Sequence, residues 1–357
     1  MAVDVAVRGA GPVGCTLALL LHGLGKRVAL AGRRPGGTAP GAARPITLSH
    51  ASRLILERAG AWPALRATPI TTIHVSQAGG FGRTLLTAAD AGVPALGHVV
   101  DYAALAASLA ARAAAAGIEI SYDAGAALDD AALLVHAEGA SGDANEKRYG
   151  QDALVALVAA EPRAGSTAYE RFTTGGPLAL LPLEGRYAVV WGASEERARA
   201  LCAATDDVFL SALERSFGSR AGRFVAVASR GVFPLALRVR AARVGEREVF
   251  VGNAAQTLHP VAGQGLNLGL RDAWELAQAI ADAPDPGEAT VLGRYAARRR
   301  LDAAATIRAT DLLAGLFLGA NPLARAARGA ALTALDVCAP ARRFFARRMI
   351  YGASALP

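Results

Sequence analysis

Valine occupies every second position from residue 3 to residue 7, and the chain then changes to a different apolar spacing. Strict alternation of this kind predicts a short strand. Over residues 13–24, apolar side chains recur every three or four positions, which predicts a helix that ends at Gly25. A second strand is expected over residues 27–31. The N-terminus is therefore predicted to form a βαβ unit.

A second change of pattern occurs between Val249 and Asp272. An apolar strand is followed by a loop that contains His259 and Pro260, and glycines at positions 263, 265 and 269 then enter a helix expected to run to about Ile280. Glycine lets backbone N–H groups approach a ligand closely, and a helix N-terminus favours negative charge. The segment predicts an anion site at this helix start; the alternative is a glycine-rich turn before a surface helix.

The turn after the first strand, G-A-G-P-V-G, has the glycine spacing of a dinucleotide-binding motif at Gly9, Gly11 and Gly14. Such glycines allow a tight turn, close approach to a pyrophosphate, and close packing of helix on strand. Gly32 stands where an acid would bind the adenosine ribose, so a hydrogen bond worth about 1.5–3 kcal/mol is missing. The two arginines that follow are read as solvated, the alternative being a 2′-phosphate contact and hence NADP.

Composition sets the broad class. The chain has 357 residues, of which 53% are hydrophobic, enough for a large core and two joined domains. Its three cysteines lie far apart and its six histidines form no ligand pattern, so we expect neither disulfides nor a metal site. No signal peptide fits, and the uncharged apolar run at 312–320 is too short to span a bilayer. We therefore expect a soluble, cytoplasmic protein.

The net charge of +8 is concentrated in residues 290–357, which hold eleven arginines against three aspartates. We interpret this segment as a helical cap. Whether it only covers the core or also rests on an anionic lipid surface or a partner protein stays open. Aromatic residues do not alternate with the charges as in a nucleic-acid-binding module, so nucleic acid is not expected as a partner.

The paired glycine motifs resemble those of the FAD-dependent aromatic hydroxylases of the p-hydroxybenzoate hydroxylase type. The sequence from Val249 to Asp272 is most similar to that of the ubiquinone-biosynthesis branch, the 2-polyprenyl-6-methoxyphenol hydroxylases. The resemblance runs from Val3 to about Ile350. Further similar segments are 43–49, 71–76, 97–102, 169–182 and 233–235.

The resemblance implies an α/β fold in three parts. A Rossmann-like FAD-binding domain would comprise residues 1–70, 97–145 and 245–285. A substrate domain with a mixed β-sheet, inserted into it, would comprise 71–96 and 146–244. A C-terminal helical cap would take up 286–357.

The resemblance also implies a set of FAD-binding residues. Gly9 to Gly14 would hold the pyrophosphate, Asn253 the ribityl or pyrophosphate region, and Gly265 to Asn267 the pyrimidine edge. The full set is Gly9, Gly11, Pro12, Val13, Gly14, Arg44, Asp101, Glu138, Gly139, Asn253, Gly263, Gln264, Gly265, Leu266 and Asn267.

Alternatives stay open at Glu138 and at His259. Glu138-Gly139 stands where the family has an Asp-Gly pair that contacts the pyrophosphates of the flavin and the reductant, but Glu138 is also readable as a surface loop acid. His259, Pro260 and Gly263 would surround flavin C4a. His259 is more readily interpreted as a residue that orders the loop than as a general base, so the sequence names no general base.

The implied activity is ring hydroxylation of a phenol, with FAD reduced transiently by NAD(P)H and oxygen transferred through a C4a-hydroperoxide. The substrate is expected to be polyprenylated, to be delivered from a membrane, and to enter an apolar channel lined by residues 172–183 and 225–237. A hydroxylase of a soluble aromatic compound is the second hypothesis. The third is a non-catalytic scaffold of a quinone-biosynthesis complex.

Overall fold

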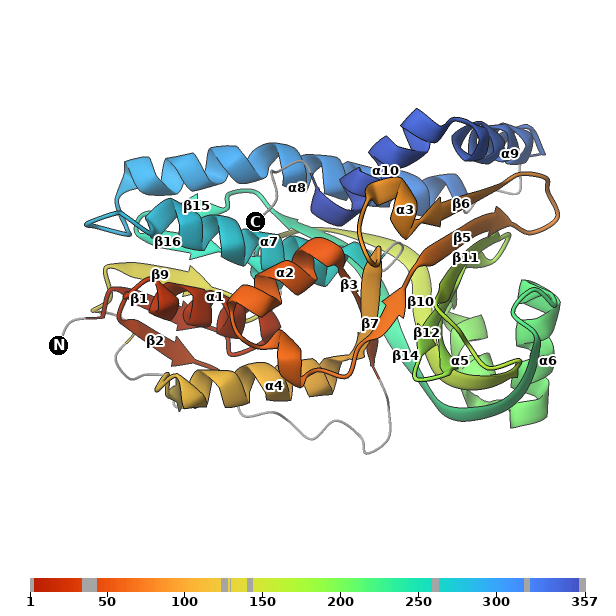
Figure 1. Cartoon of the computed structure of the whole chain (residues 1–357), viewed down its shortest axis with the longest axis horizontal. Coiled ribbons are helices and arrows are strands. Elements are labelled where there is room, and N and C mark those ends of the chain that lie inside the picture. The colour runs from red at the N-terminus through yellow and green to blue at the C-terminus, as the bar shows by residue number, and fades with distance from the viewer. Residues whose placement is uncertain are drawn as a thin grey trace.

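The computed structural model describes residues 3–33, 44–122, 128, 130–139, 144–258, 263–317 and 322–352. The molecule is elongated: a Rossmann-like part lies at one end and a large antiparallel sheet at the other (Figure 1). The long helix α8 (Ala289–Phe317) runs beside the first part and toward the second.

A six-stranded sheet forms the centre of the first part, in the order β15-β16-β9-β1-β2-β8. β1 pairs in parallel with β2 and β9, and β9 in parallel with β16. The strands are β1 (Val5–Arg8), β2 (Val28–Ala31), β8 (Ile120–Ser121), β9 (Leu133–His136), β15 (Val244–Gly245) and β16 (Glu248–Phe250). β1 is buried except for Arg8 at its end, as its apolar residues predict for a strand covered on both faces, whereas β9 alternates buried and partly exposed residues.

Helices α1 (Pro12–Gly23), α4 (Tyr102–Ala115) and α7 (Gln264–Ile280) share one apolar core with this sheet. Beside them lies a small antiparallel sheet in the order β3-β7-β4, made of β3 (Pro45–Ser49), β7 (Gly97–Asp101) and β4 (Thr68–Ile70). Helix α2 (His50–Arg58) follows β3, capped at its N-terminus by the Ser49 side chain, which accepts a hydrogen bond from the Ser52 backbone. The short turns η1 (Trp62–Ala64) and η2 (Gly252–Ala254) complete this part.

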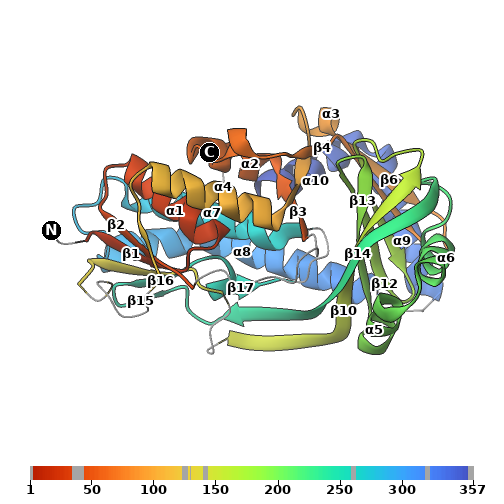
Figure 2. The ribbon, with the colours of Figure 1, turned by 90° about the horizontal axis from the view of Figure 1, so that it is seen from below.

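The second part is an eight-stranded sheet in the order β17-β14-β10-β13-β12-β11-β5-β6. Its pairs are antiparallel except β11 with β5. The strands are β5 (Thr72–Gln77), β6 (Arg83–Thr87), β10 (Ala144–Glu161), β11 (Thr167–Thr173), β12 (Gly176–Leu183), β13 (Arg186–Ser194), β14 (Arg223–Arg240) and β17 (Gln256–Thr257). The long pair β10–β14 reaches from this sheet back toward the first part (Figure 2).

One face of the large sheet is covered by α5 (Glu195–Ala203) and α6 (Asp206–Phe217). Phe209, Leu213 and Phe217 of α6 pack there on alternate residues of β12 and β13, such as Leu180 and Val189. The residues between them on these strands point to the other face. The large sheet therefore presents a second apolar face to the rest of the molecule.

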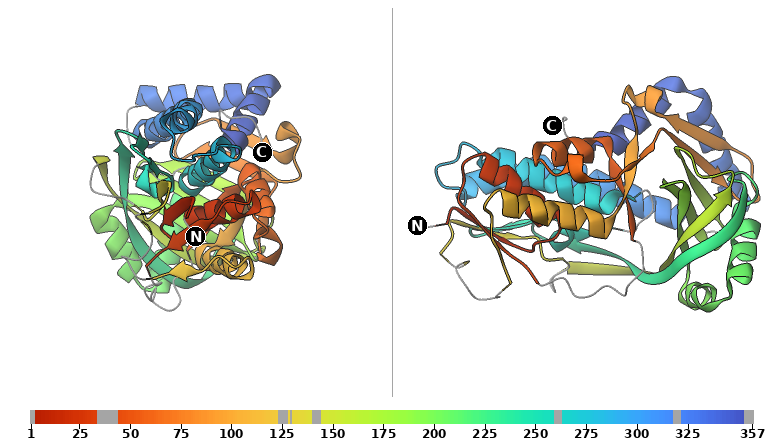
Figure 3. Two further views of the ribbon diagram at one scale, coloured as in Figure 1. Left: turned by 90° about the vertical axis from the view of Figure 1, so that its left-hand side faces the viewer. Right: turned by 60° about the horizontal axis from the view of Figure 1, so that its bottom comes forward.

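The C-terminal helices cross from the first part to the second. After α8, α9 (Pro322–Val337) packs on β5 and β6, and α10 (Ala339–Tyr351) packs on α9, α2 and α3 (Ala88–Ala91). The Thr84 hydroxyl donates to the Leu332 carbonyl at 2.6 Å, and the Leu85 backbone donates to the Asp336 carboxylate at 2.8 Å. Figure 3 shows these helices, in dark blue, beside the orange strands at the β5–β6 end of the large sheet.

The predicted fold class is confirmed: a Rossmann-like α/β part, a mixed sheet inserted into it, and a helical C-terminal segment. The predicted second-motif helix ends at Ile280 as expected, and the first βαβ unit matches within two residues. Among the described residues, no helix is both long enough and apolar enough to cross a bilayer.

Candidate active site

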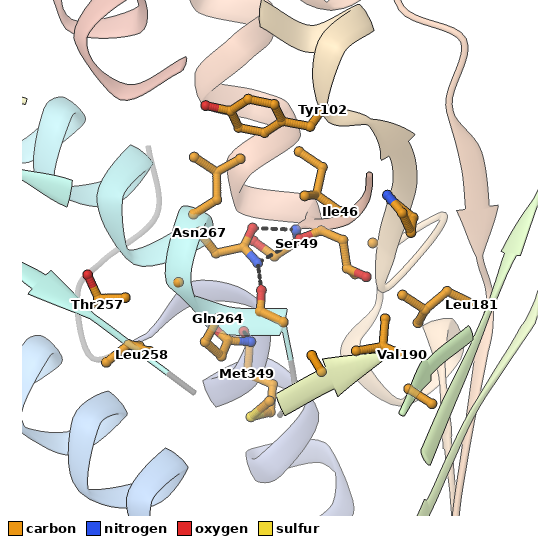
Figure 4. Close-up of a pocket in the computed structure, with 18 of the residues that line it drawn as sticks. Ile46, Ser49, Tyr102, Leu181, Val190, Thr257, Leu258, Gln264, Asn267 and Met349 are labelled. Carbon is orange, nitrogen blue, oxygen red and sulfur yellow. Dashed lines mark hydrogen bonds between the residues drawn. The ribbon is translucent and has the colours of Figure 1, made fainter. Parts of the chain in front are cut away.

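A cavity of about 1200 Å³ lies between the glycine motifs, the large sheet and the C-terminal helices. Figure 4 shows how its walls come together: Asn267 of α7 faces Ser49, Gln264 of α7 lies beside Met349 of α10, and Leu181 and Val190 come from the large sheet. Segments separated by most of the chain thus form one continuous cavity. It has two ends, a glycine-rich one and an apolar one.

The glycines of the first motif differ in what surrounds them. A Cβ at Gly9 would lie 2.4 Å from the Ala137 carbonyl carbon, and one at Gly14 would lie 1.8 Å from the Gly9 oxygen. These two glycines therefore allow the β1–α1 turn to pack on β9 and on itself. Gly11, the N-cap of α1, is open: a Cβ there would meet only the Tyr102 hydroxyl, at 3.9 Å. Gly9, Gly11, Pro12 and Val13 line the cavity, whereas Gly14 lies behind it.

The second glycine motif packs against the first at the Val13 side chain. A Cβ at Gly269 would lie 2.8 Å from a Val13 methyl carbon, and one at Gly252 would lie 3.1 Å from it. Gly263 caps α7 in the left-handed conformation, with φ of 59°, which favours glycine. Gly265 has open space around it and lines the cavity together with Gln264 and Leu266. The two helix N-termini therefore open into the same cavity.

Asn267 holds the loop and strand around it. Its side-chain oxygen accepts from the Ser49 backbone at 2.8 Å and the Ser52 hydroxyl at 2.7 Å. Its amide nitrogen donates to the carbonyls of Thr47 at 2.9 Å and Gly263 at 2.7 Å. These four bonds use both donors and both acceptor positions of the amide. The side chain therefore joins α7 to β3 and α2 (Figure 4), while Asn267 also lines the cavity and its contact with a flavin stays a prediction.

Other polar groups face the cavity without such partners. Asn253 is exposed in the turn after β16 and lines the cavity. The Thr257 hydroxyl is buried in the wall and has no hydrogen-bond partner among the described residues. Because a buried unpaired hydroxyl costs free energy, it marks a place where a ligand or water completes the structure.

The loop after β9 brings Glu138 and Gly139 to the cavity. A Cβ at Gly139 would meet nothing within 4 Å, and its φ of 107° favours glycine. The Glu138 carboxylate lies 3.1 Å from His136 Nδ1. Burial alone would raise the pKa of Glu138, but hydrogen bonds from His136 and the backbone outweigh it and lower that pKa. Glu138 is therefore an exposed acid at the cavity edge, held there by its contact with His136.

Arg44 and Asp101, expected together at the cofactor, take different positions. The Arg44 guanidinium lines the cavity, 4.6 Å from the centre of the Tyr102 ring. Asp101 is not among the described residues that line it. Its carboxylate instead caps α4 through the Ala104 backbone at 3.1 Å and holds the Arg44 backbone at 3.1 Å. Asp101 is thus connected to the cavity through Arg44, and its own contact with the cofactor stays a prediction.

Gly32 has a steric reason to be glycine. A Cβ there would lie 2.5 Å from the Ala10 methyl carbon and 3.0 Å from the Ala10 nitrogen. An acid at this position, as in other dinucleotide-binding motifs, would therefore require Ala10 to move. Arg33 lines the cavity. His259 and Pro260, expected near flavin C4a, lie outside the described residues, as does Arg34.

A buried ion cluster, which the sequence did not predict, lies behind the second motif. Asp272 of α7 is fully buried and accepts from the Gly252 backbone at 3.1 Å and from Arg299 Nε at 2.7 Å. Asp302, also fully buried, accepts from Arg299 at 2.8 Å and from Arg271 at 2.9 Å. The cluster thereby fixes the turn that carries Asn253. The only sequence signal was a run of charged residues in helices expected to be covered.

The apolar end of the cavity uses the inner face of the large sheet. Phe172, Pro177, Ala179 and Leu181 line it, as predicted for the range 172–183. The predicted range 225–237 contributes only Leu235 among the described residues, since Val225 is exposed. The remaining wall comes from α9 and α10, which the sequence suggested only as a cap. Their lining residues are Arg328, Ala331, Leu332, Leu335, Phe345, Ala346, Met349 and Ile350.

Comparison with known proteins identifies the family of the chain. A family of FAD-binding domains matches residues 131–310. Ubiquinone hydroxylase UbiL of Rhodospirillum rubrum is 32% identical over 380 residues, which cover 96% of this chain and 88% of UbiL. The chain belongs to the ubiquinone-biosynthesis flavin hydroxylases. This hydroxylase also shares 35% identity with the 3-demethoxyubiquinol 3-hydroxylase of Escherichia coli, over 48% of this chain and 47% of that one.

The fold of the hydroxylase is that of a solved flavin enzyme. Its structure matches the p-nitrophenol 4-monooxygenase of Pseudomonas putida with a TM-score of 0.79 at 18% identity, covering 99% of each chain. The chain is therefore an FAD-dependent monooxygenase of the aromatic hydroxylase type.

The residues at the glycine-rich end fit FAD. Gly11, Gly139 and Gly265 leave backbone open to the cavity where side chains would project into it. The N-termini of α1 and α7 favour a pyrophosphate and an electron-rich ring edge. The unpartnered Thr257 hydroxyl lies in the same wall.

Proposed function

We propose that the hydroxylase acts on a lipophilic phenol with a polyprenyl chain, with NAD(P)H as its electron donor. The observation that supports this most directly is the cavity itself. From the flavin-binding end it continues along a sheet face that is mostly apolar and reaches the side chains of α9 and α10. A polyprenyl chain gains about 0.8 kcal/mol for each CH₂ removed from water, so such a cavity suits it.

The glycine-rich end would hold FAD. Gly11 and its neighbours at the start of α1 would contact the pyrophosphate, and Arg44 and Glu138 would lie along the same edge. Asn253 and the backbone of Gly263 to Leu266 would contact the flavin half, with Asn267 fixing their positions through its four hydrogen bonds. FAD, when bound and reduced, supplies the activated oxygen; the protein orients the ring and excludes water.

The test compares a prenylated phenol with its unprenylated analogue on the FAD-loaded enzyme, measuring hydroxylated product for each NAD(P)H consumed. We expect a higher kcat/KM for the prenylated phenol. Ala179→Phe, which places a ring on the sheet face of the cavity, should abolish that preference. A higher kcat/KM for a short, soluble phenol would favour the second hypothesis, a soluble substrate. FAD binding with no turnover of any phenol would favour a scaffold.

A second feature supports contact with a membrane. The outer face of α9 is apolar and uncharged: Leu323 is 81% exposed and Val337 is 76% exposed. Between them Ala326, Ala327, Ala330, Thr333 and Ala334 are also exposed. The helix's charged residues, Arg325, Arg328 and Asp336, lie on its partly buried side. Exposed apolar faces of this kind mark interaction surfaces.

We propose that this face of α9 rests on an anionic lipid bilayer. Its inner face is a wall of the substrate cavity, so a lipid surface at the outer face would place the source of a lipophilic substrate next to the cavity. The neighbouring helix α10 exposes Arg343, Phe344 and Arg347, a combination typical of anionic lipid contact.

Vesicle sedimentation would test this contact. The hydroxylase should pellet with vesicles that contain phosphatidylglycerol and less with pure phosphatidylcholine. Leu323→Glu with Val337→Glu should weaken pelleting by tenfold or more, given about 1.5–3 kcal/mol for each large apolar side chain. The control is Val208→Glu on α6, where the native valine is 54% exposed. If the α9 variant binds vesicles normally but a native dimer becomes a monomer, the face belongs to a second copy instead.

A further inference from the structure

One acidic side chain stands on the otherwise apolar sheet face of the cavity. Glu170 lies on β11, opposite Val75 of β5 on one side and Ala179 of β12 on the other. Ala168 and Phe172, two residues before and after it, line the cavity as well, so Glu170 belongs to the inward-facing set of the strand. Among the described sheet residues that line the cavity, Glu170 therefore carries the one carboxyl group, beside alanine, valine, leucine and phenylalanine side chains.

No described residue forms a hydrogen bond or an ion pair with the Glu170 side chain. Its burial raises the pKa of the carboxyl group to about 7, with no charged neighbour contributing. Glu170 is partly exposed and lines the cavity, and a carboxyl group withdrawn from water without a partner costs free energy, so proteins retain such groups mainly at functional sites. The carboxylates of the buried ion cluster, in contrast, are fully paired by arginines.

We infer that Glu170 is the general base of the hydroxylation and accepts the proton of the substrate's ring hydroxyl. This inference rests on the proposed function. The O–H bond of the phenol breaks, its electron pair stays on the phenol oxygen, and the proton binds a Glu170 carboxylate oxygen. The ring thereby gains phenolate character and becomes more electron-rich toward the oxygen that the flavin supplies. When the product leaves, the proton passes to water.

The position and acidity of Glu170 suit this role. A phenol hydroxyl has a pKa of about 10, so an ordinary carboxylate accepts its proton poorly. Burial raises the pKa of the carboxyl group toward that of the phenol, and general bases work best when their pKa lies near the working pH. The polar head of the substrate would bind at Glu170, while the apolar residues around it hold the rest of the ring and chain.

Other titratable groups near Glu170 are directed elsewhere or lie in the cavity wall. His74 of β5 and Tyr169 of β11 pack against each other on the α6 side of the sheet, where Tyr169 contacts Phe217. Arg171 donates to the Ser216 carbonyl at 3.3 Å. Arg83 at the start of β6 is exposed, and Arg328 of α9 lines the same cavity.

Kinetics of the FAD-loaded enzyme test the inference. Glu170→Gln keeps the size of the side chain but cannot accept the proton, so kcat should fall roughly 100-fold. In the wild type kcat/KM should decline as pH falls below about 7, because Glu170 becomes protonated. This acidic limb should disappear in Glu170→Gln, whose remaining activity should rise with pH as solvent removes the phenol proton. Glu195→Gln, at an exposed acid on α5, is the matched control.

A binding measurement that needs no turnover complements the kinetics. The oxidised holoenzyme should bind a geranylated phenol roughly tenfold more tightly than its methyl ether, because only the phenol donates a hydrogen bond to the carboxylate. Glu170→Leu should bind both equally. If wild type turned over no phenol, the proposed function would be wrong, yet this preference would still report on Glu170. Wild-type rates and an unchanged pH profile in Glu170→Gln, or an unchanged preference in Glu170→Leu, would overturn the inference.

Discussion

At the scale of single residues, the glycines of this hydroxylase serve two different purposes. Gly14 has no room for a side chain, since a Cβ would lie 1.8 Å from the Gly9 oxygen. Gly11 has room within the protein but faces the cavity. The same residue type thus satisfies a packing requirement at one position and a ligand requirement at the other.

This difference predicts that substitution by alanine affects stability at one position and FAD binding at the other. Gly14→Ala should lower the free energy of unfolding of the apo-protein by about 1–3 kcal/mol, because the added methyl group overpacks the turn. Gly11→Ala should leave that stability nearly unchanged but weaken FAD binding by tenfold or more. Thermal unfolding of the apo-proteins and flavin fluorescence titrations check both. If Gly11→Ala binds FAD as tightly as wild type, FAD does not lie at this turn.

Gly32 illustrates a limit of motif reading. The motif would have an acid here that binds the ribose, but a Cβ at Gly32 would lie 2.5 Å from the Ala10 methyl carbon. We now expect Gly32→Glu alone to weaken FAD binding or lower stability. Adding Ala10→Gly should recover FAD affinity, since it removes the clashing methyl group. Fluorescence titration of both variants tests this, and tighter binding by the single variant would show that the turn moves at little cost.

The pKa of Glu170 also affects stability. In the folded protein burial raises it from 4.5 to about 7, so the folded state resists ionisation. The favourable contribution of the neutral carboxyl is complete below about pH 4.5 and is lost as pH rises through about 7. Glu170→Gln should therefore match wild type in stability near pH 5 and exceed it near pH 8, by about 2–3 kcal/mol. Urea unfolding of the FAD-loaded proteins at the two pH values measures this, and equal differences at both would contradict it.

At the scale of elements, two asparagines near the second motif differ in their surroundings. Asn253 sits exposed on the turn after β16, whereas Asn267 of α7 is 1% exposed and makes four hydrogen bonds to protein groups. Both line the cavity, but the side-chain amide of Asn267 is already occupied by these bonds. Asn267 connects α7 to β3 and α2.

Substitution by alanine should separate these roles. Asn267→Ala leaves the Ser49 N–H and two carbonyls without partners, so it should destabilise the apo-protein by about 2–4 kcal/mol. Asn253→Ala should keep apo-protein stability within about 0.5 kcal/mol, as is usual for exposed positions, but weaken FAD binding. The checks are denaturant unfolding without FAD and titration with FAD. A large stability loss in Asn253→Ala would show that its side chain supports the turn.

The sequence predicted local elements well and long-range contacts poorly. The two glycine motifs identified β1, α1 and α7 because turn and helix signals are local. The four bonds of Asn267 reach back more than 200 residues, to Thr47, Ser49 and Ser52, and no spacing rule reveals them. Glu170 was visible as an acid at an inward-alternating position of a predicted strand. What the sequence lacked was the burial that sets its chemistry.

At the scale of the whole molecule, the C-terminal helices are part of the active-site architecture. They supply one wall of the cavity. Gly352, which follows α10, packs on the buried ion cluster. A Cβ at Gly352 would lie 2.2 Å from an Asp302 carboxylate oxygen. Asp302 shares Arg299 with Asp272, which holds the Gly252 turn of the second motif. The flavin-binding end and the substrate wall therefore have a common anchor.

Removing one charge from this anchor should affect both ends of the site. Asp272→Asn leaves Arg243, Arg271 and Arg299 with Asp302 as their only remaining carboxylate in the cluster. Because an uncompensated buried charge costs about 3–5 kcal/mol, we expect a loss of that size in the free energy of unfolding. FAD affinity should fall too, since the Gly252 backbone loses its charged acceptor.

The control is Asp282→Asn, an exposed acid just beyond α7, which should behave as wild type. The experiment measures urea unfolding, FAD titration and binding of a geranylated phenol for both variants. Loss of phenol binding in Asp272→Asn even at saturating FAD would show that the cluster holds the α9–α10 wall in place as well as the flavin-binding end. Reduced FAD affinity with normal phenol binding would confine its effect to the second glycine motif.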